Sequence, residues 1–298
     1  MNALSGALSG ARAALTSPNG RRIIYGLAVT LLIVGLVIAL NALPADIALK
    51  QWRYVMLIFV LIAPLGVITN TLETELTARL LNVRFGWRRA FKLSVLASAA
   101  NVLPLPGGPL VRTVALKDLG VDLKLASSIV IAVAVQWVGV ILIVAGVCFT
   151  ILNIIQTGIT SIFLGGGALL FSLFWMRAIG SSFKNIALIM SARLFTSAVG
   201  VVGIWWSFAA LGETLTLIEA SIFSLASASG VAVSFVPAGL GVTEAAAAAL
   251  AVIISLSPAL AFVAATLYRI IWLAFLLPVA AIISLTSTTS GYLKNRPT

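Results

Sequence analysis

Long apolar runs separated by short polar segments follow one another along the whole chain. Six runs are unbroken and long enough to cross a hydrocarbon core of about 30 Å as helices. They cover residues 23–43, 52–72, 125–150, 159–176, 186–211 and 259–285. Since no run alternates with the period of two that a membrane β-barrel strand requires, the pattern predicts spanning helices.

Two further apolar stretches, residues 90–116 and 217–256, are each broken near the middle by proline and glycine. The breaks contain Pro104, Pro106, Gly107, Gly108 and Pro109 in the first stretch, and Pro237, Gly239 and Gly241 in the second. Proline removes a hydrogen-bond donor, so such a break at membrane depth is tolerated only where the backbone is buried in protein or lines a cavity. We therefore predict two re-entrant helical hairpins, with a single kinked spanning helix in each place as the alternative.

The distribution of basic residues favours hairpins over kinked spans, since a hairpin returns to the side that it left. With two hairpins, fifteen Lys and Arg residues lie on one side of the membrane, and only Lys50 and Arg53 lie on the other. The fifteen are Arg12, Arg21, Arg22, Arg79, Arg84, Arg88, Arg89, Lys92, Arg112, Lys117, Lys124, Arg177, Lys184, Lys294 and Arg296. Because loops rich in Lys and Arg stay in the cytoplasm, we expect an integral inner-membrane protein with both termini cytoplasmic.

Spacing along the chain predicts an internal repeat. The runs that begin at residues 23, 52 and 125 have counterparts that begin 136, 134 and 134 residues later, and Pro106 and Pro237 are 131 residues apart. We therefore predict an all-α polytopic membrane protein with six spanning helices and two re-entrant hairpins, arranged as two inverted-topology repeats. The expected parts are a cytoplasmic segment (1–22), a first repeat (23–150), a second repeat (151–285) and a cytoplasmic tail (286–298).

Composition agrees with a bilayer environment. Of the 298 residues, 61% are hydrophobic and 9% are charged, with a mean hydropathy of +1.16, a balance that no water-soluble domain could keep in solution. The net charge of +11 comes from basic loops rather than from an aromatic-interleaved surface, so no nucleic-acid partner is expected.

Residues 23–43 could be mistaken for a signal peptide, but their length and their counterpart in the second half favour a spanning helix.

The chain lacks the side chains of many catalytic and metal sites. It has no histidine and one cysteine, Cys148, which lies in an apolar run. Disulfide frameworks, Cys/His zinc sites, His-ligated haem and Ser-His or Cys-His nucleophiles are thereby excluded. We expect neither an enzyme nor a bound cofactor or metal.

Charged residues at membrane depth are functional candidates because they are costly there. Arg269 lies about eleven residues into the last span, and Glu244 begins the second arm of the second hairpin. Ser257, in the turn between them, lies 13 residues after Glu244 and 12 before Arg269, so both should reach the same depth and form an ion pair. The alternatives are a helix-capping role for Glu244 and a purely structural pairing for Arg269.

The first hairpin supplies two more candidates, Arg112 directly after its break and Asn101 just before it. A guanidinium group matches phosphate oxygens in a bidentate fork, and free amides at helix starts bind anions. Both residues could therefore contact a phosphate. For Arg112, the alternative is a solvated arginine beside the membrane.

Four other charged residues have simpler interpretations. Glu73, Glu75 and Arg79 are predicted to lie at a solvated helix end, with Glu75 and Arg79 spaced for an i,i+4 pair. Arg193, near the cytoplasmic end of its span, is predicted to extend its head group to the membrane interface.

The segments LPLPGGPLVRTVALKDLG, SFVPAGLGVTEAAAAAL and LYRIIW resemble the transmembrane flippase domain of the lysylphosphatidylglycerol synthase family, over nearly the whole chain. The residues that match the family's proline, glycines, glutamate and buried arginine are Pro237, Gly239, Gly241, Glu244 and Arg269. The first half departs from the family pattern. Pro109 precedes Arg112 where the family usually has a glutamate, and the next span reads Gln136 and Trp137 where it often has Glu-Arg.

The resemblance implies a lipid translocase that moves a phospholipid or a polyprenyl- or hopanoid-type lipid across the inner membrane. The residues expected to contact its anionic or phosphate-bearing head group are Arg112, Arg269, Glu244 and Asn101. Since only residues 286–298 follow the last predicted span, no soluble synthase domain is expected. The alternatives are a secondary transporter of a small solute, an intramembrane enzyme and a lipid-binding scaffold. The oligomeric state, including a homo-oligomer, is left open.

The two-hairpin topology predicts the outcome of accessibility labelling. In a Cys148→Ser background, single cysteines in residues 117–124 should react from the cytoplasmic face, because the first hairpin returns there. Cysteines in residues 212–216 and at Ser257 should react from the opposite face. Reaction of residues 117–124 from outside, or of residues 212–216 and Ser257 from different sides, would contradict the two hairpins.

Overall fold

The computed structural model describes residues 30, 32–42, 50–102, 107–232 and 239–294. Every regular element in these ranges is a helix, and five helices are long and apolar enough to cross a membrane. These five are Trp52–Leu80, Leu123–Ile151, Ile155–Ala178, Phe183–Ala210 and Pro258–Thr286. By the length and composition of its helices, the chain is therefore an all-α membrane protein.

Each of these helices covers one of the predicted apolar runs, except that Leu211, the last residue of the run 186–211, follows the end of its helix. The first combines α3 (Trp52–Leu57), a π-helical turn η1 (Ile58–Ile62) and α4 (Ala63–Leu80). The others are α7 (Leu123–Ile151), α8 (Ile155–Ala178), α9 (Phe183–Ala210) and α13 (Pro258–Lys294). Of the sixth predicted run, residues 23–43, the structure describes residue 30 and the helix Leu32–Ala42.

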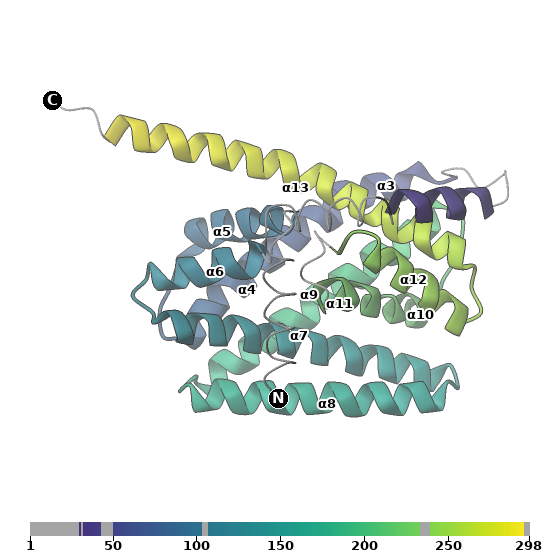
Figure 1. Cartoon of the computed structure of the whole chain (residues 1–298), viewed down its shortest axis with the longest axis horizontal. Helices are drawn as coiled ribbons and strands as arrows, with labels where there is room; N and C mark the ends of the chain where they lie inside the picture. The colour runs from purple at the N-terminus through teal and green to yellow at the C-terminus, as the bar shows by residue number, and fades with distance from the viewer. Residues whose placement is uncertain (1–29, 31, 43–49, 103–106, 233–238, 295–298) are drawn as a thin grey trace, which may run out of the picture.

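The two interrupted stretches form groups of shorter helices. The first contains α5 (Trp87–Ala100) and α6 (Gly107–Lys117), which pack against each other. The second contains α10 (Leu217–Ile222), α11 (Ser224–Ala232) and α12 (Val242–Ile253), and α11 packs against α12. In Figure 1 the α5–α6 pair lies in the left half of the molecule and α10–α12 in the right half, while α7 and α8 run along both. The two groups thus occupy opposite ends of the bundle.

The glycines of the two breaks allow close backbone approach. Gly107 begins α6 so close to the carbonyl of Ala100 that a Cβ atom would clash with it. In the second break, Gly239 and Gly241 adopt φ angles of +62° and +77°, which other residues rarely adopt. Three of the predicted break residues, Pro104, Pro106 and Pro237, lie outside the described residues.

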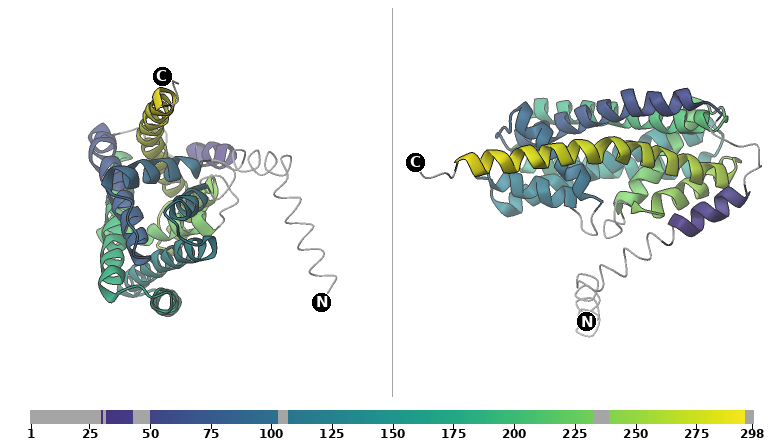
Figure 2. Two further views of the ribbon diagram at one scale, coloured as in Figure 1. Left: turned by 90° about the vertical axis from the view of Figure 1, so that its left-hand side faces the viewer. Right: turned by 90° about the horizontal axis from the view of Figure 1, so that it is seen from above.

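Small residues bring α7 and α8 together along most of their length. A Cβ atom built on Gly146 would lie 2.8 Å from the carbonyl oxygen of Gly158, and one on Gly139 would lie 3.0 Å from that of Gly165. Glycine at such positions lets two membrane helices approach closely, so that van der Waals contact holds them together. The two helices run side by side in Figures 1 and 2.

The outer surface of α8 is strongly apolar. Phe163, Leu170 and Phe174 are 80%, 69% and 76% exposed. An apolar surface of this size is unfavourable in water and suits contact with lipid chains. The carboxyl-terminal part of α13 extends beyond the remaining helices, as both figures show.

The α7–α8 contact predicts a position-dependent effect of large side chains. Gly158→Leu should lower the unfolding temperature in detergent, because overpacking costs about 1–3 kcal/mol. Gly167→Leu, on the same helix, is the matched control, because a Cβ atom there meets nothing within 4 Å. Equal unfolding temperatures for the two variants would contradict the close α7–α8 approach.

Candidate functional site

A largely buried ion pair joins the second interrupted stretch to the last helix. Glu244 in α12 is 0% exposed, and its Oε1 lies 3.1 Å from Nε of Arg269 in α13. The ion pair predicted from the equal depth of the two residues is therefore confirmed. Glu244 is also a cap, since its Oε2 accepts a hydrogen bond of 2.9 Å from the Gly241 N–H at the start of α12. One carboxylate thus stabilises both the helix start and the arginine.

The guanidinium of Arg269 reaches the backbone of the break itself. Its Nη2 donates a hydrogen bond of 3.4 Å to the carbonyl of Gly239, and the side chain is 13% exposed. Its Nη1 is buried and has no hydrogen-bond partner among the described residues. We call Glu244 and Arg269 the balanced pair, because their formal charges cancel. One donor of this pair is still available to an acceptor.

A second buried ion pair joins α4 to α9. Nη1 of Arg193 lies 2.7 Å from Oε2 of Glu73, and their side chains are 10% and 1% exposed. The hydroxyl of Thr196 donates a hydrogen bond of 2.6 Å to the other oxygen of Glu73. The predictions of a solvated helix end for Glu73 and of an interfacial head group for Arg193 are therefore wrong. Each of the two side chains is held inside the bundle by the other.

These predictions failed because α4 is longer than the apolar run that indicated it. The helix continues from the predicted end at Leu72 to Leu80, and this part is buried against its neighbours. Glu75, also predicted to be solvated, is buried and accepts hydrogen bonds from the N–H groups of Phe85 and Gly86. The predicted Glu75–Arg79 pair is present, at 3.0 Å. Polar residues can be buried here because the carboxylates accept hydrogen bonds and the threonine hydroxyls donate hydrogen bonds to backbone carbonyls.

Arg112 adds a positive charge near the Glu73–Arg193 pair, and the described residues supply no ion-pair partner for it. It interacts electrostatically with both members, and its Nε is buried without a hydrogen-bond partner in the described part of the chain. Arg112, Arg193 and Glu73 together are called the basic cluster. With two guanidinium groups and one carboxylate, its formal charge is +1. Such an excess inside an apolar bundle favours binding of an anion.

Asn101 lies directly before the first break, at the end of α5, as expected. Its side chain is exposed, and its Oδ1 accepts a hydrogen bond of 2.8 Å from the Gly108 N–H. It therefore caps the start of α6, which explains how the first break is held. This bond uses the side-chain oxygen, and a head-group contact through Asn101 stays a prediction.

Gln136 is a buried polar residue that was noted only as a departure from the family pattern. It is 0% exposed, and neither atom of its amide group has a hydrogen-bond partner within the described ranges. It lies one turn beyond Ala132 and Val133 of α7, which share a hydrophobic cluster with Ala192 of α9. Gln136 is therefore near the level of the basic cluster, and its free amide is a further polar group at this depth.

The balanced pair and the basic cluster lie at different depths. Tyr268, next to Arg269, is in close contact with Gly203 of α9, where an added Cβ would clash with its ring. Gly203 is ten residues beyond Arg193 on the same helix, which corresponds to about 15 Å along the axis. The bundle therefore contains two buried charged sites at two levels, both next to α9.

The fold and these sites define the class of protein: an all-α membrane protein with paired and excess charge buried among its helices. Comparison of the chain with protein-family models, with curated proteins and with solved structures finds no match. The arguments for function therefore come from the residues and their geometry.

The balanced pair predicts a large effect of removing one charge. Glu244→Gln should destabilise the protein by about 3–5 kcal/mol, because it leaves Arg269 buried without its counter-charge. Asp118→Asn is the control, since the Arg89–Asp118 pair is 3.8 Å apart and exposed, and such pairs contribute only about 0–1 kcal/mol. Thermal unfolding in detergent measures both. Similar unfolding temperatures for the two variants would contradict the buried ion pair.

Proposed function

We propose that the protein is a lipid translocase of the inner membrane, which moves a phosphate-bearing lipid between leaflets. The observation that supports this most is the positive excess of the basic cluster inside an apolar helix bundle. A ligand of this cluster has to be anionic, and it has to reach a site surrounded by membrane helices. Membrane lipids with a phosphate group satisfy both conditions.

Arginine is the side chain best suited to such a head group. Its planar guanidinium presents paired N–H donors that match two phosphate oxygens, and it stays charged when buried. In the basic cluster Arg193 is paired with Glu73, whereas Arg112 has no ion-pair partner among the described residues; the Nε atoms of both are buried without a hydrogen-bond partner there. Arg112 is therefore the residue we propose to make the first contact with the phosphate.

The arrangement of the short helices supports alternating access. We propose that α5–α6 and α10–α12 are re-entrant hairpins that enter from opposite faces, as parts of two inverted-topology repeats. This agrees with their places at opposite ends of the bundle in Figure 1. Inverted repeats with discontinuous helices allow one half to rock against the other, so that a central site opens to each face in turn.

The balanced pair would serve as the second contact of the head group. Arg269 holds Glu244 and the Gly239 carbonyl, and its Nη1 has no partner within the described residues. A phosphate that arrives at this level could accept from Nη1 without breaking the ion pair. The lipid would then pass from an unpaired guanidinium to a paired one, which binds an anion less strongly and favours release.

Translocation in vesicles tests this function. With the protein reconstituted, a labelled phospholipid should become accessible to a quencher confined to the opposite side, and Arg112→Gln should abolish most of this movement. The variant should still fold, since Glu73 and Arg193 remain paired. Lys117→Gln, on the exposed part of the same helix, is the matched control and should keep wild-type translocation.

Two results would contradict the proposal. One is undiminished translocation by Arg112→Gln, which would remove the basic cluster from the pathway. The other is a wild-type protein that moves no labelled lipid but is thermally stabilised by a water-soluble solute, which would favour a small-solute transporter.

A further inference from the structure

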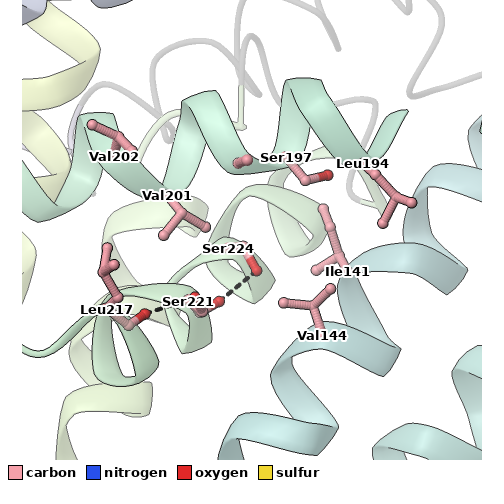
Figure 3. A pocket seen from close by; sticks show the side chains of 10 residues that line it. Ile141, Val144, Leu194, Ser197, Val201, Val202, Leu217, Ser221 and Ser224 are labelled. Atoms are coloured by element: carbon pink, nitrogen blue, oxygen red, sulfur yellow. Dashed lines mark hydrogen bonds between the residues drawn. The ribbon is translucent and has the colours of Figure 1, made fainter. Parts of the chain in front are cut away.

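A pocket of about 310 Å³ lies between α7, α9 and the α10–α11 segment. This volume is near the lower end of the range of about 300–1,000 Å³ for small-molecule sites. Most of its lining is aliphatic, with Ile141 and Val144 from α7, Val201 from α9 and Leu217 from α10 (Figure 3). We call it the α9–α10 pocket. Its composition suits a hydrocarbon chain.

The pocket is open to the surface of the bundle. Leu194 and Leu217, at its edges, are 49% and 51% exposed. Of the helices around it, α7 and α9 have the length and hydropathy of membrane spans, and the segment Leu217–Gly230 is a shorter apolar helix, so we expect lipids to meet this opening. A hydrocarbon chain is therefore the occupant that its surroundings supply.

The position of the pocket relates it to both charged levels. On α9 the lining runs from Leu194, directly after Arg193, to Val202, directly before Gly203. The pocket thus covers the interval between the basic cluster and the level of the balanced pair. A lipid whose phosphate lies at the basic cluster would have its chains pointing into this interval.

One hydroxyl in the pocket is not accounted for by the fold. Ser221 and Ser224 donate hydrogen bonds to the carbonyls of Leu217 and Ser221, drawn as dashed lines in Figure 3. The Oγ of Ser197 is buried and has no hydrogen-bond partner in the described ranges. Ser197 lies four residues after Arg193, about 6 Å along α9 and on the same strip of the helix. A buried hydroxyl without a hydrogen-bond partner is unfavourable. A ligand that places a hydrogen-bond acceptor next to the Ser197 Oγ would therefore be stabilised in this pocket.

We propose that the α9–α10 pocket holds an acyl chain of a diacyl glycerophospholipid, whose ester carbonyl accepts a hydrogen bond from Ser197. This rests on the proposed lipid translocase function and specifies its substrate class. The order of groups in the lipid matches the order along α9: phosphate at the basic cluster, ester carbonyl one turn beyond it, hydrocarbon chain along Val201. A polyprenyl phosphate has no ester carbonyl, and it would leave the Ser197 hydroxyl unpaired.

The experiment measures lipid retention by the intact protein in native mass spectrometry. The probes are a diacyl phosphatidylglycerol, its dialkyl ether analogue, a polyprenyl phosphate and glycerol phosphate, which has the anionic group without chains. The wild type should retain the diacyl lipid about two- to tenfold better than the ether analogue, the range for one hydrogen bond. Glycerol phosphate should be retained least.

Two variants separate the parts of the proposal. Ser197→Ala should lose the preference for the ester over the ether lipid, because only the donor is removed. Ala198→Phe should lower retention of both lipids, since the larger side chain fills the pocket. Ala187→Phe is the matched control, with the same substitution at an exposed position of α9 outside the pocket, and should retain both as the wild type does.

Specific results would overturn the inference. If Ser197→Ala keeps the ester preference, or if the wild type has none, the hydrogen bond to the carbonyl is wrong. If folded Ala198→Phe retains lipid as well as Ala187→Phe does, the chain does not occupy the pocket. In either case wild-type translocation in vesicles would leave the translocase function standing. A wild type that neither retains nor moves lipid would overturn both proposals.

Discussion

A charge inside an apolar helix bundle is stable only if opposite charge or hydrogen bonds replace the water that it has lost. This constraint explains the arrangement of the buried polar residues. Glu244 is satisfied by Arg269 and by the start of α12, and Glu73 by Arg193 and Thr196. The exception is Arg112, whose charge exceeds what the neighbouring carboxylate can neutralise. The proposed function follows from this imbalance.

The broken stretches matter because they bring backbone groups and helix starts into the bundle. The carbonyl of Gly239 accepts from Arg269, and the Gly241 N–H donates to Glu244. An unbroken spanning helix would have used both groups in its own hydrogen bonds. The break therefore supplies the polar atoms that hold the balanced pair, and its Gly239 lies against Gly230 of α11 so closely that a Cβ atom on Gly239 would clash.

Helix α9 connects the separate features into one arrangement. It packs against α4, where Arg193 meets Glu73, and against α13, where Gly203 contacts Tyr268. The face between these contacts lines the α9–α10 pocket, so charge, hydroxyl and hydrocarbon surface follow one another along a single helix. Small residues on α7 and α8 give a comparable close packing at the edge of the bundle.

Sequence alone determined the helical, membrane-spanning character of the chain, because the length and hydropathy of a run decide whether it can cross a bilayer. It also predicted the Glu244–Arg269 pair, since the two residues flank one turn at nearly equal distances along adjacent helices. The Glu73–Arg193 pair was missed because its members are 120 residues apart and come from helices that are not consecutive. Only the tertiary structure decides which faces of α4, α6 and α9 meet. That meeting buries Glu73 and Arg193 and brings the half-buried Arg112 close enough to interact with both, because removal from water depends on packing and not on position in the chain.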